Sequence, residues 1–245
     1  MKFGAELLQK RLMNDNKKVG AVILSRFNSR RLPGKALIEI QGKPVLDYII
    51  ERLEQVLSTQ DIVIATSAEK SDDPIAEFAD KRSIKCFRGP LENVAGRFFE
   101  AGNSQNWDYA IRVNGDNVFA DINLMKSMIN RAKNENLDFI SNVKHRTYPK
   151  GMSIEIVNLE WYKNLLNEIE KDKNYREHVT LYIYENNPRG DYHFQMNDEL
   201  PEAAGIQLAL DTPEDLARTR RIISTFDLPH YTYNLKEIMD IYGEE

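Results

Sequence analysis

Short apolar runs alternate with longer amphipathic stretches from Val19 onward. Runs without internal polar alternation are typical of parallel strands that are covered on both faces. They predict strands at Val19–Leu24, Asp61–Thr66, Ile84–Arg88, Tyr109–Val113, Leu137–Asn142, Ser153–Val157 and Ile206–Leu210. The stretches between them, several with proline in the first turn, predict helices at Pro44–Val56, Pro74–Arg82, Leu91–Ala101, Asn123–Asn136, Leu159–Lys171, Arg176–Glu185 and Pro213–Thr225. This alternation predicts an α/β fold, with a mostly parallel sheet between two helical layers in a three-layer sandwich.

The regular pattern does not extend over the whole chain. Residues 1–18 carry only a weak helical stripe, so we expect an N-terminal appendage before a single domain at 19–226. Within that domain, the segment from about 141 to 207 is irregular and rich in Lys, Arg, His, Tyr and Asn, as an acceptor-binding lid or a dimer contact would be. Residues 227–245 are expected to form a C-terminal tail.

Composition narrows the class of protein. The chain has 245 residues, 42% of them hydrophobic, which is enough for one large core. A net charge of -5 disfavours a polymeric nucleic-acid partner. No apolar stretch reaches the roughly 18 residues that span a bilayer, so we expect no membrane association and a cytoplasmic location. The single Cys86, in an apolar run, is expected to be a buried and inert thiol.

The loop after the first predicted strand carries a cluster of cations. Residues 25–35 contain Arg26, Arg30, Arg31 and Lys35 together with the pair Pro33-Gly34. Arginine offers a planar fork of donors to phosphate oxygens and lysine a movable point charge, so the loop predicts a polyphosphate site, although a solvated basic turn stays open. The sequence lacks G-x-G-x-x-G, and Gly34-Lys35 lacks the Walker spacing. A Rossmann dehydrogenase or a P-loop ATPase is therefore disfavoured.

Two aspartates are candidate metal ligands. Asp116 follows the strand Tyr109–Val113 directly behind Gly115, and Asp211 follows the apolar run Ile206–Leu210. Mg²⁺ prefers oxygen ligands, usually one or two carboxylates completed by substrate phosphate and water. Asp211 also precedes Thr212-Pro213 at the start of a predicted helix, so on spacing alone metal ligation and helix capping are both open.

Three motifs together resemble a known family. They are Arg26-x-x-Ser29-x-Arg31-Leu32-Pro33-Gly34-Lys35, Gly115-Asp116, and Asp211-Thr212-Pro213-Glu214-Asp215-Leu216. This set is similar to the cytidylyltransferases that include the CMP-Kdo and CMP-acylneuraminate synthetases, and above all to the SpsF-type polysaccharide proteins. The resemblance runs from Val19 to about Thr225 and implies a Rossmann-like nucleotidyltransferase fold of the GT-A-like kind.

The resemblance implies roles for individual residues. Arg26, Ser29, Arg31 and Lys35 would contact the triphosphate of CTP, and Asp116 and Asp211 would bind Mg²⁺, with Thr212 capping the helix. Further nucleotide contacts are expected from Leu24, Ser25, Thr66, Ser67, Arg88 and Asn114. The acceptor side is expected to use Tyr148, Glu155, Arg176 and His178, although a histidine at the start of a helix is more often a packing or capping residue. Asn93 and the turn Met152-Ser153-Ile154-Glu155 depart from the SpsF pattern near the ligand, which leaves the acceptor open.

These features together predict an enzyme that transfers CMP from CTP to a sugar acid or a phosphorylated small acceptor and releases pyrophosphate, for surface polysaccharide synthesis. Arg26, Arg31, Lys35, Asp116 and Asp211 are its expected catalytic residues. A homodimer is an open option. A glycosyltransferase is disfavoured because Asp116-Asn117-Val118 stands where such enzymes carry Asp-x-Asp. A non-catalytic nucleotide-binding protein is disfavoured because both aspartates are present.

Overall fold

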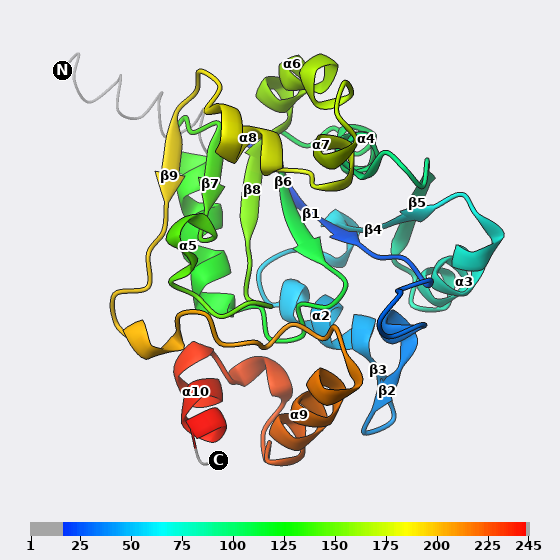
Figure 1. Cartoon of the computed structure of the whole chain (residues 1–245), viewed down its shortest axis with the longest axis vertical. Helices are drawn as coiled ribbons and strands as arrows, with labels where there is room; N and C mark the ends of the chain where they lie inside the picture. The colour runs from blue at the N-terminus through cyan, green and yellow to red at the C-terminus, as the bar shows by residue number, and fades with distance from the viewer. Residues whose placement is uncertain (1–16, 244–245) are drawn as a thin grey trace.

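The computed structural model describes residues 17–243, which are built around a seven-stranded sheet of order β5-β4-β1-β6-β8-β7-β9 (Figure 1). The strands are β1 Val19–Leu24, β4 Ile62–Ser67, β5 Lys85–Gly89, β6 Tyr109–Asn114, β7 Phe139–Ser141, β8 Glu155–Asn158 and β9 Tyr192–Phe194. β1 pairs in parallel with β4 and β6, β4 with β5, and β7 with β9. Only β8 among these seven is antiparallel to its neighbours. The mostly parallel sheet is therefore confirmed. A small antiparallel pair, β2 Glu39–Ile40 and β3 Lys43–Pro44, lies apart from it.

Helices cover both faces of the sheet, which confirms the three-layer sandwich. One apolar core joins the sheet to α2 Val45–Glu54, α3 Asp73–Lys81, α5 Ile122–Asn134, α9 Pro213–Ser224 and α10 Leu235–Gly243. A second core joins the other face to α4 Val94–Asn103, α6 Leu159–Ile169 and α8 Leu181–Asn186. The short helix α7 Lys173–Glu177 lies beside α4. In Figure 1, α9 and α10 (orange and red) lie at the end of the molecule opposite α6.

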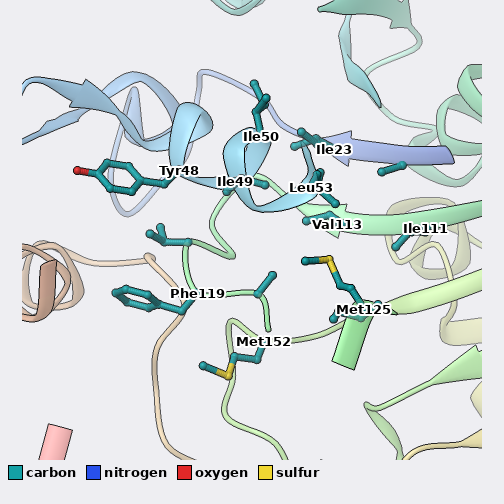
Figure 2. Close-up of a cluster of buried hydrophobic side chains, with 14 of the residues drawn as sticks. Ile23, Tyr48, Ile49, Ile50, Leu53, Ile111, Val113, Phe119, Met125 and Met152 are labelled. Carbon is teal, nitrogen blue, oxygen red and sulfur yellow. The ribbon is translucent and has the colours of Figure 1, made fainter. Parts of the chain in front are cut away.

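The burial of β1 shows why its sequence is apolar without a break. Ala21 and Ile23 pack into the first core and Val22 into the second, so both faces of the strand are removed from water. Figure 2 shows Ile23 close to Leu53 of α2 in the first core. The strand is thereby fixed at the centre of the sheet, with its carboxyl end free to carry a loop.

β1 is also the point where the chain reverses its direction of travel across the sheet. From β1 the chain proceeds to β4 and β5 on one side and later returns to β6 on the other. The last residue of β1, Leu24, pairs with Ala65 of β4 and with Asn114 of β6. In open α/β sheets, ligands bind beyond the carboxyl ends of the strands at such a switch point. The fold thus directs attention to the loops that follow β1 and β6.

Three expectations from the sequence are wrong, and one strand was not predicted. The single helix expected over Arg176–Glu185 is two helices, because the chain turns at His178, the C-terminal cap of α7. The segment Ile206–Leu210 is not a strand and makes only an isolated bridge between Gln207 and Lys150. The strand β9 was not expected, because its three residues follow a segment without periodicity. Cys86 is exposed, because β5 is an edge strand.

The segment expected as a C-terminal tail is packed as far as it is described. Ile238 of α10 is fully buried, and the peptide N–H of Leu235 donates to Asp121 Oδ2 at 2.7 Å. Arg52 of α2, itself fully buried, donates to the carbonyl oxygens of His230 and Tyr233 at 2.6 and 3.0 Å. Residues 1–16 of the expected appendage lie outside the described residues. No helix within 17–243 is both long enough and apolar enough to cross a membrane.

Candidate active site

The loop after β1, residues 25–35, is folded back on itself and is called the β1 loop below. The carbonyl oxygen of Phe27 accepts hydrogen bonds from the backbone N–H groups of Ser29 and Gly34 at 3.0 and 2.9 Å. Gly34 has a φ of 70°, a conformation that glycine adopts without steric cost. The Pro-Gly turn seen in the sequence therefore closes the loop and places Lys35 at the start of the 3-10 turn Lys35–Leu37.

Lys35 joins the two aspartates expected to be metal ligands. Its Nζ lies 2.7 Å from Asp116 Oδ2 and 3.0 Å from Asp211 Oδ1, and the three side chains are only 15, 18 and 23% exposed. Arg31, which is far more exposed, lies 3.0 Å from the same oxygen of Asp211. The structure thus brings four of the five expected catalytic residues into one cluster at the carboxyl ends of β1 and β6.

Backbone contacts explain how residues so far apart in the sequence meet. The N–H of Leu210 donates to the carbonyl oxygen of Asp116 at 3.2 Å, which holds the residue before Asp211 against the turn after β6. Helix α9 then begins with a capping box, in which Thr212 accepts from the N–H of Asp215. Asp215 in turn accepts from the N–H of Asp211 at 3.1 Å. The cap is therefore Thr212, as the resemblance implied, and the carboxylate of Asp211 is left for Lys35 and Arg31.

Gly115 is required by the close approach of β1 to the turn after β6. Its N–H donates to the carbonyl oxygen of Leu24 at 2.9 Å. A Cβ at this position would lie 2.7 Å from Ser25 Oγ, inside contact distance. Leu24, Ser25 and Asn114, three expected nucleotide contacts, therefore lie together at this junction. Their contacts with a nucleotide stay a prediction.

Asp72 fastens the β1 loop to the end of β4, and the sequence analysis missed this role. It is 1% exposed and accepts hydrogen bonds from the N–H of Phe27 at 2.7 Å and from the N–H and Oγ of Ser67. Burial alone would raise the pKa of Asp72, but these hydrogen bonds stabilise the carboxylate and bring its pKa below the ordinary value. The run Asp72-Asp73-Pro74 resembles a helix cap, yet Asp72 makes no side-chain capping bond to α3.

The expected nucleobase contacts on β4 and β5 are tied to one another. Thr66 and Ser67, at the end of β4, are fully buried. Arg88 donates to the carbonyl oxygens of Ser67 and Glu69 at 3.0 and 2.8 Å and lies 2.7 Å from Asp73. Arg88 therefore supports the loop after β4 in this structure, and its contact with a nucleobase stays a prediction.

Helix α7 contacts the β1 loop through Glu177, which lies between the expected acceptor residues Arg176 and His178. Arg26 Nη2 donates to Glu177 Oε1 at 3.1 Å, so the fifth expected catalytic residue connects the β1 loop to α7. Arg176 on the same helix donates to the carbonyl oxygen of Glu170 at 2.7 Å, and the exposed His178 follows Glu177. Glu177 was not among the expected site residues, although it lies between two that were.

The other two expected acceptor residues are largely withdrawn from water. Glu155 is 1% exposed, forms an ion pair with Arg112 and accepts from the hydroxyl of Tyr184 at 2.6 Å. Tyr148 donates to the carbonyl oxygen of Met196 at 3.5 Å, and burial raises its pKa to about 12. Arg112 was missed, although a charged residue inside the apolar strand Tyr109–Val113 is unusual enough to be noticed.

The aspartate pair fits a divalent cation in its donor chemistry. Asp116 and Asp211 already converge on one cationic group, the Lys35 ammonium, through one oxygen each. Residues 17–243 hold no cluster of three or more His, Cys, Asp or Glu side chains placed for a metal ion. Two carboxylates completed by phosphate and water are the usual set for Mg²⁺ at nucleotide sites, and the pair meets that requirement.

Fold and site together describe an α/β nucleotidyltransferase, and comparison with known proteins gives the family. A family model described as Cytidylyltransferase matches residues 21–243, so the chain belongs to the cytidylyltransferase family. It is 32% identical to the spore coat polysaccharide biosynthesis protein SpsF of Bacillus subtilis, over 79% of this chain and 81% of that protein.

Solved structures show the same architecture. A cytidylyltransferase from Leptospira borgpetersenii superposes with a TM-score of 0.83 at 27% identity, over 94% of this chain and 95% of that one. A CMP:2-keto-3-deoxy-manno-octonic acid synthetase complexed with CTP superposes with a TM-score of 0.62 at 17% identity, over 85% of this chain and 99% of that one, and supports the fold alone.

Proposed function

We propose that this protein transfers CMP from CTP to a sugar acid or a phosphorylated small acceptor and releases pyrophosphate. The observation that carries the proposal is the cluster of Lys35, Asp116 and Asp211 at the switch point of the sheet, next to the cations of the β1 loop. Membership of the cytidylyltransferase family supports CTP as the nucleotide.

The reaction needs charge neutralisation and positioning. The acceptor oxygen attacks the α-phosphorus of CTP in line, the bond from the α-phosphorus to the oxygen bridging the β-phosphate breaks, and pyrophosphate leaves with that oxygen. Arg26, Arg31 and Lys35 would neutralise the charge of the leaving group. Asp116 and Asp211 would hold Mg²⁺, which supplies positive charge at the reacting phosphate.

The ion pairs of the cluster are compatible with these roles. The Lys35 ammonium neutralises two carboxylates that would otherwise repel each other. CTP with Mg²⁺ brings both an anion for Lys35 and a cation for the aspartates. Lys35 can then turn to the triphosphate without leaving either carboxylate unpaired. Arg26 would likewise exchange Glu177 for phosphate and release α7 at the acceptor side.

The acceptor would bind between the β1 loop and α7, near Arg176 and His178, and Glu155 and Tyr148 are further proposed acceptor residues. The names of the relatives point to glycan precursors: SpsF is a spore coat polysaccharide biosynthesis protein, and several others are 3-deoxy-manno-octulosonate cytidylyltransferases. We therefore assign the acceptor to the sugar acids and sugar phosphates of surface polysaccharide synthesis.

The test is to identify the product. The protein is incubated with Mg²⁺, CTP and either a ulosonic acid or a sugar phosphate, with UTP, ATP and GTP in parallel, and the products are identified by mass spectrometry. We expect a compound of acceptor plus CMP, formed with CTP in preference to the other nucleotides. A glycosyltransferase would instead join a sugar from a nucleotide sugar to the acceptor. A parallel incubation with nucleotide sugars tests for that activity, and calorimetry measures CTP binding; a glycoside product or a failure to bind CTP contradicts the proposal.

A further inference from the structure

A buried ion pair lies on the sheet beside the proposed acceptor site. Arg112 of β6 and Glu155 of β8 are direct partners across the two strands, and Ser141 of β7 is the next partner in the row. Successive side chains of a strand alternate between faces, so Arg112 shares its face with Asn114, two residues nearer the carboxyl end of β6. This is the face covered by α4, α6 and α8, and the pair lies close to the site.

The pair is embedded in contacts that lead to the acceptor segment. The hydroxyl of Tyr184 on α8 donates to Glu155 Oε1 at 2.6 Å, and Ser141 Oγ lies 2.5 Å from the same hydroxyl. The hydroxyl of Tyr162 on α6 donates to the carbonyl oxygen of Val179, the residue after His178, at 2.6 Å. Glu155, the partner of Arg112, is thus joined through Tyr184 to α8, which begins three residues after His178.

Glu155 and Arg112 differ in whether all their buried polar atoms have hydrogen-bond partners. Glu155 is 1% exposed and each of its oxygens has a partner, one in Arg112 and the other in Tyr184. Arg112 donates to Glu155 through Nη1, but its buried Nε has no hydrogen-bond partner within 17–243, and the side chain keeps 18% exposure. The almost fully buried Arg52 and Arg97 also have a buried Nε without a partner among the described residues. Arg112 differs from them because its side chain is partly exposed and lies two residues before Asn114 at the carboxyl end of β6.

We propose that Arg112 binds an anionic oxygen group of the acceptor, either a carboxylate or a phosphate, and that Glu155 and Tyr184 are positioning residues that hold its guanidinium. The planar fork of arginine matches both groups, and the ionised Glu155 keeps it in one orientation. This inference rests on the proposed function and deepens it. It also changes the role expected for Glu155: this residue holds Arg112 in place and does not contact the acceptor directly.

The test compares Arg112→Gln and Arg112→Lys with the wild type in pyrophosphate release from CTP and Mg²⁺. The acceptor panel contains a ulosonic acid, a sugar phosphate and neutral sugars or polyols, and CTP affinity is measured by calorimetry. Arg131→Gln is the matched control, since Arg131 makes an exposed arginine–glutamate pair on α5. We expect Arg112→Gln to raise the acceptor KM at least tenfold, with CTP affinity within twofold of the wild type, and Arg112→Lys to restore part of the loss.

The acceptor that supports pyrophosphate release shows which group Arg112 binds: the ulosonic acid indicates a carboxylate and the sugar phosphate indicates a phosphate. Tyr184→Phe removes one hydroxyl without removing charge, and we expect it to raise the acceptor KM by a smaller factor than Arg112→Gln while kcat is kept. If Arg112→Gln proves unstable, Arg112→Lys and Tyr184→Phe still decide the question. An unchanged acceptor KM in these variants, or activity with neutral acceptors alone, overturns the inference but does not contradict the proposed transferase activity. No pyrophosphate release with any acceptor contradicts the proposed function itself.

Discussion

The peptide N–H of Leu210 donates a hydrogen bond of 3.2 Å to the carbonyl oxygen of Asp116. This contact joins the turn after β6 to the segment before α9 through backbone atoms alone, so it does not depend on the charge of either aspartate side chain. The two carboxylates are consequently brought together by the fold, and Lys35 neutralises a pair whose placement is already fixed. Under the proposed function, a metal ion would replace the lysine between the two carboxylates without a rearrangement of the backbone.

Replacing Lys35 tests this exchange. In Lys35→Met, Asp116 and Asp211 lose their shared ammonium, so we expect the nucleotide-free protein to bind Mg²⁺ more tightly than the wild type in calorimetry. The same variant lacks a cation for the triphosphate, and its kcat/KM for CTP should fall roughly 100-fold. Lys126→Met, on the exposed side of α5, is the control and should change neither value. Weaker Mg²⁺ binding by Lys35→Met would show that the aspartates do not form the metal site.

Asp72→Asn tests the attachment of the β1 loop to β4. Asparagine replaces one carboxylate oxygen with an NH₂ group, which would face a backbone N–H that now donates to Asp72. Because two donors then face each other, we expect the free energy of unfolding, measured with urea, to fall by about 2–3 kcal/mol. CTP affinity should fall as well, because the loop loses its contact through Phe27. Asp73→Asn, in an exposed ion pair with Arg88, serves as the control. Unchanged stability would mean that Asp72 is not needed to hold the loop.

The central part of the fold could be predicted from the sequence because its signals are local. β1 was predicted at Val19–Leu24 with the bounds found in the structure, since a strand buried on both faces must be apolar throughout. The proximity of the loops that carry Lys35 and Asp116 follows from similar reasoning, because the carboxyl ends of the neighbouring parallel strands β1 and β6 lie at one edge of the sheet. Asp211 does not follow a strand and is brought to them by the backbone contact between Leu210 and Asp116. The family motifs then separated Asp211 from an ordinary helix cap.

Features that depend on long-range contacts could not be predicted. The apolar run Ile206–Leu210 is typical of a strand, but in the structure it makes only one bridge, from Gln207 to Lys150. The neighbouring sequence gives no sign of this difference. The exposure of Cys86 follows from the position of β5 at the edge of the sheet, which the order of segments in the chain does not reveal. The fastening role of Asp72 and the pairing of Arg112 with Glu155 likewise join residues from separate elements.

His230 should make stability depend on pH. Burial, and then the nearby Arg52, lower its pKa from 6.5 to about 4, against the opposing effect of Glu51. Between these values the unfolded chain binds a proton that the folded protein does not, so stability is complete above about pH 6.5 and falls as the pH is lowered. We expect a loss of about 2 kcal/mol from pH 7 to pH 5 by urea unfolding.

In His230→Gln this dependence should be much reduced, because glutamine does not titrate in the range. His193→Gln, on the half-buried strand β9, is the matched control and should keep the wild-type slope. A slope in His230→Gln equal to that of the wild type would assign the pH dependence to other groups.

The decisive measurement is the rate of pyrophosphate release from CTP, with Mg²⁺ and an effective acceptor, in the wild type, Asp116→Asn and Asp211→Asn. Each variant keeps the size of the side chain and the backbone contacts but removes one of the two charges that meet on Lys35. We predict that kcat falls at least about 100-fold in each variant, while Asp227→Asn, in the exposed loop after α9, retains the wild-type rate. Wild-type rates in Asp116→Asn and Asp211→Asn would contradict the assignment of this cluster as the active site.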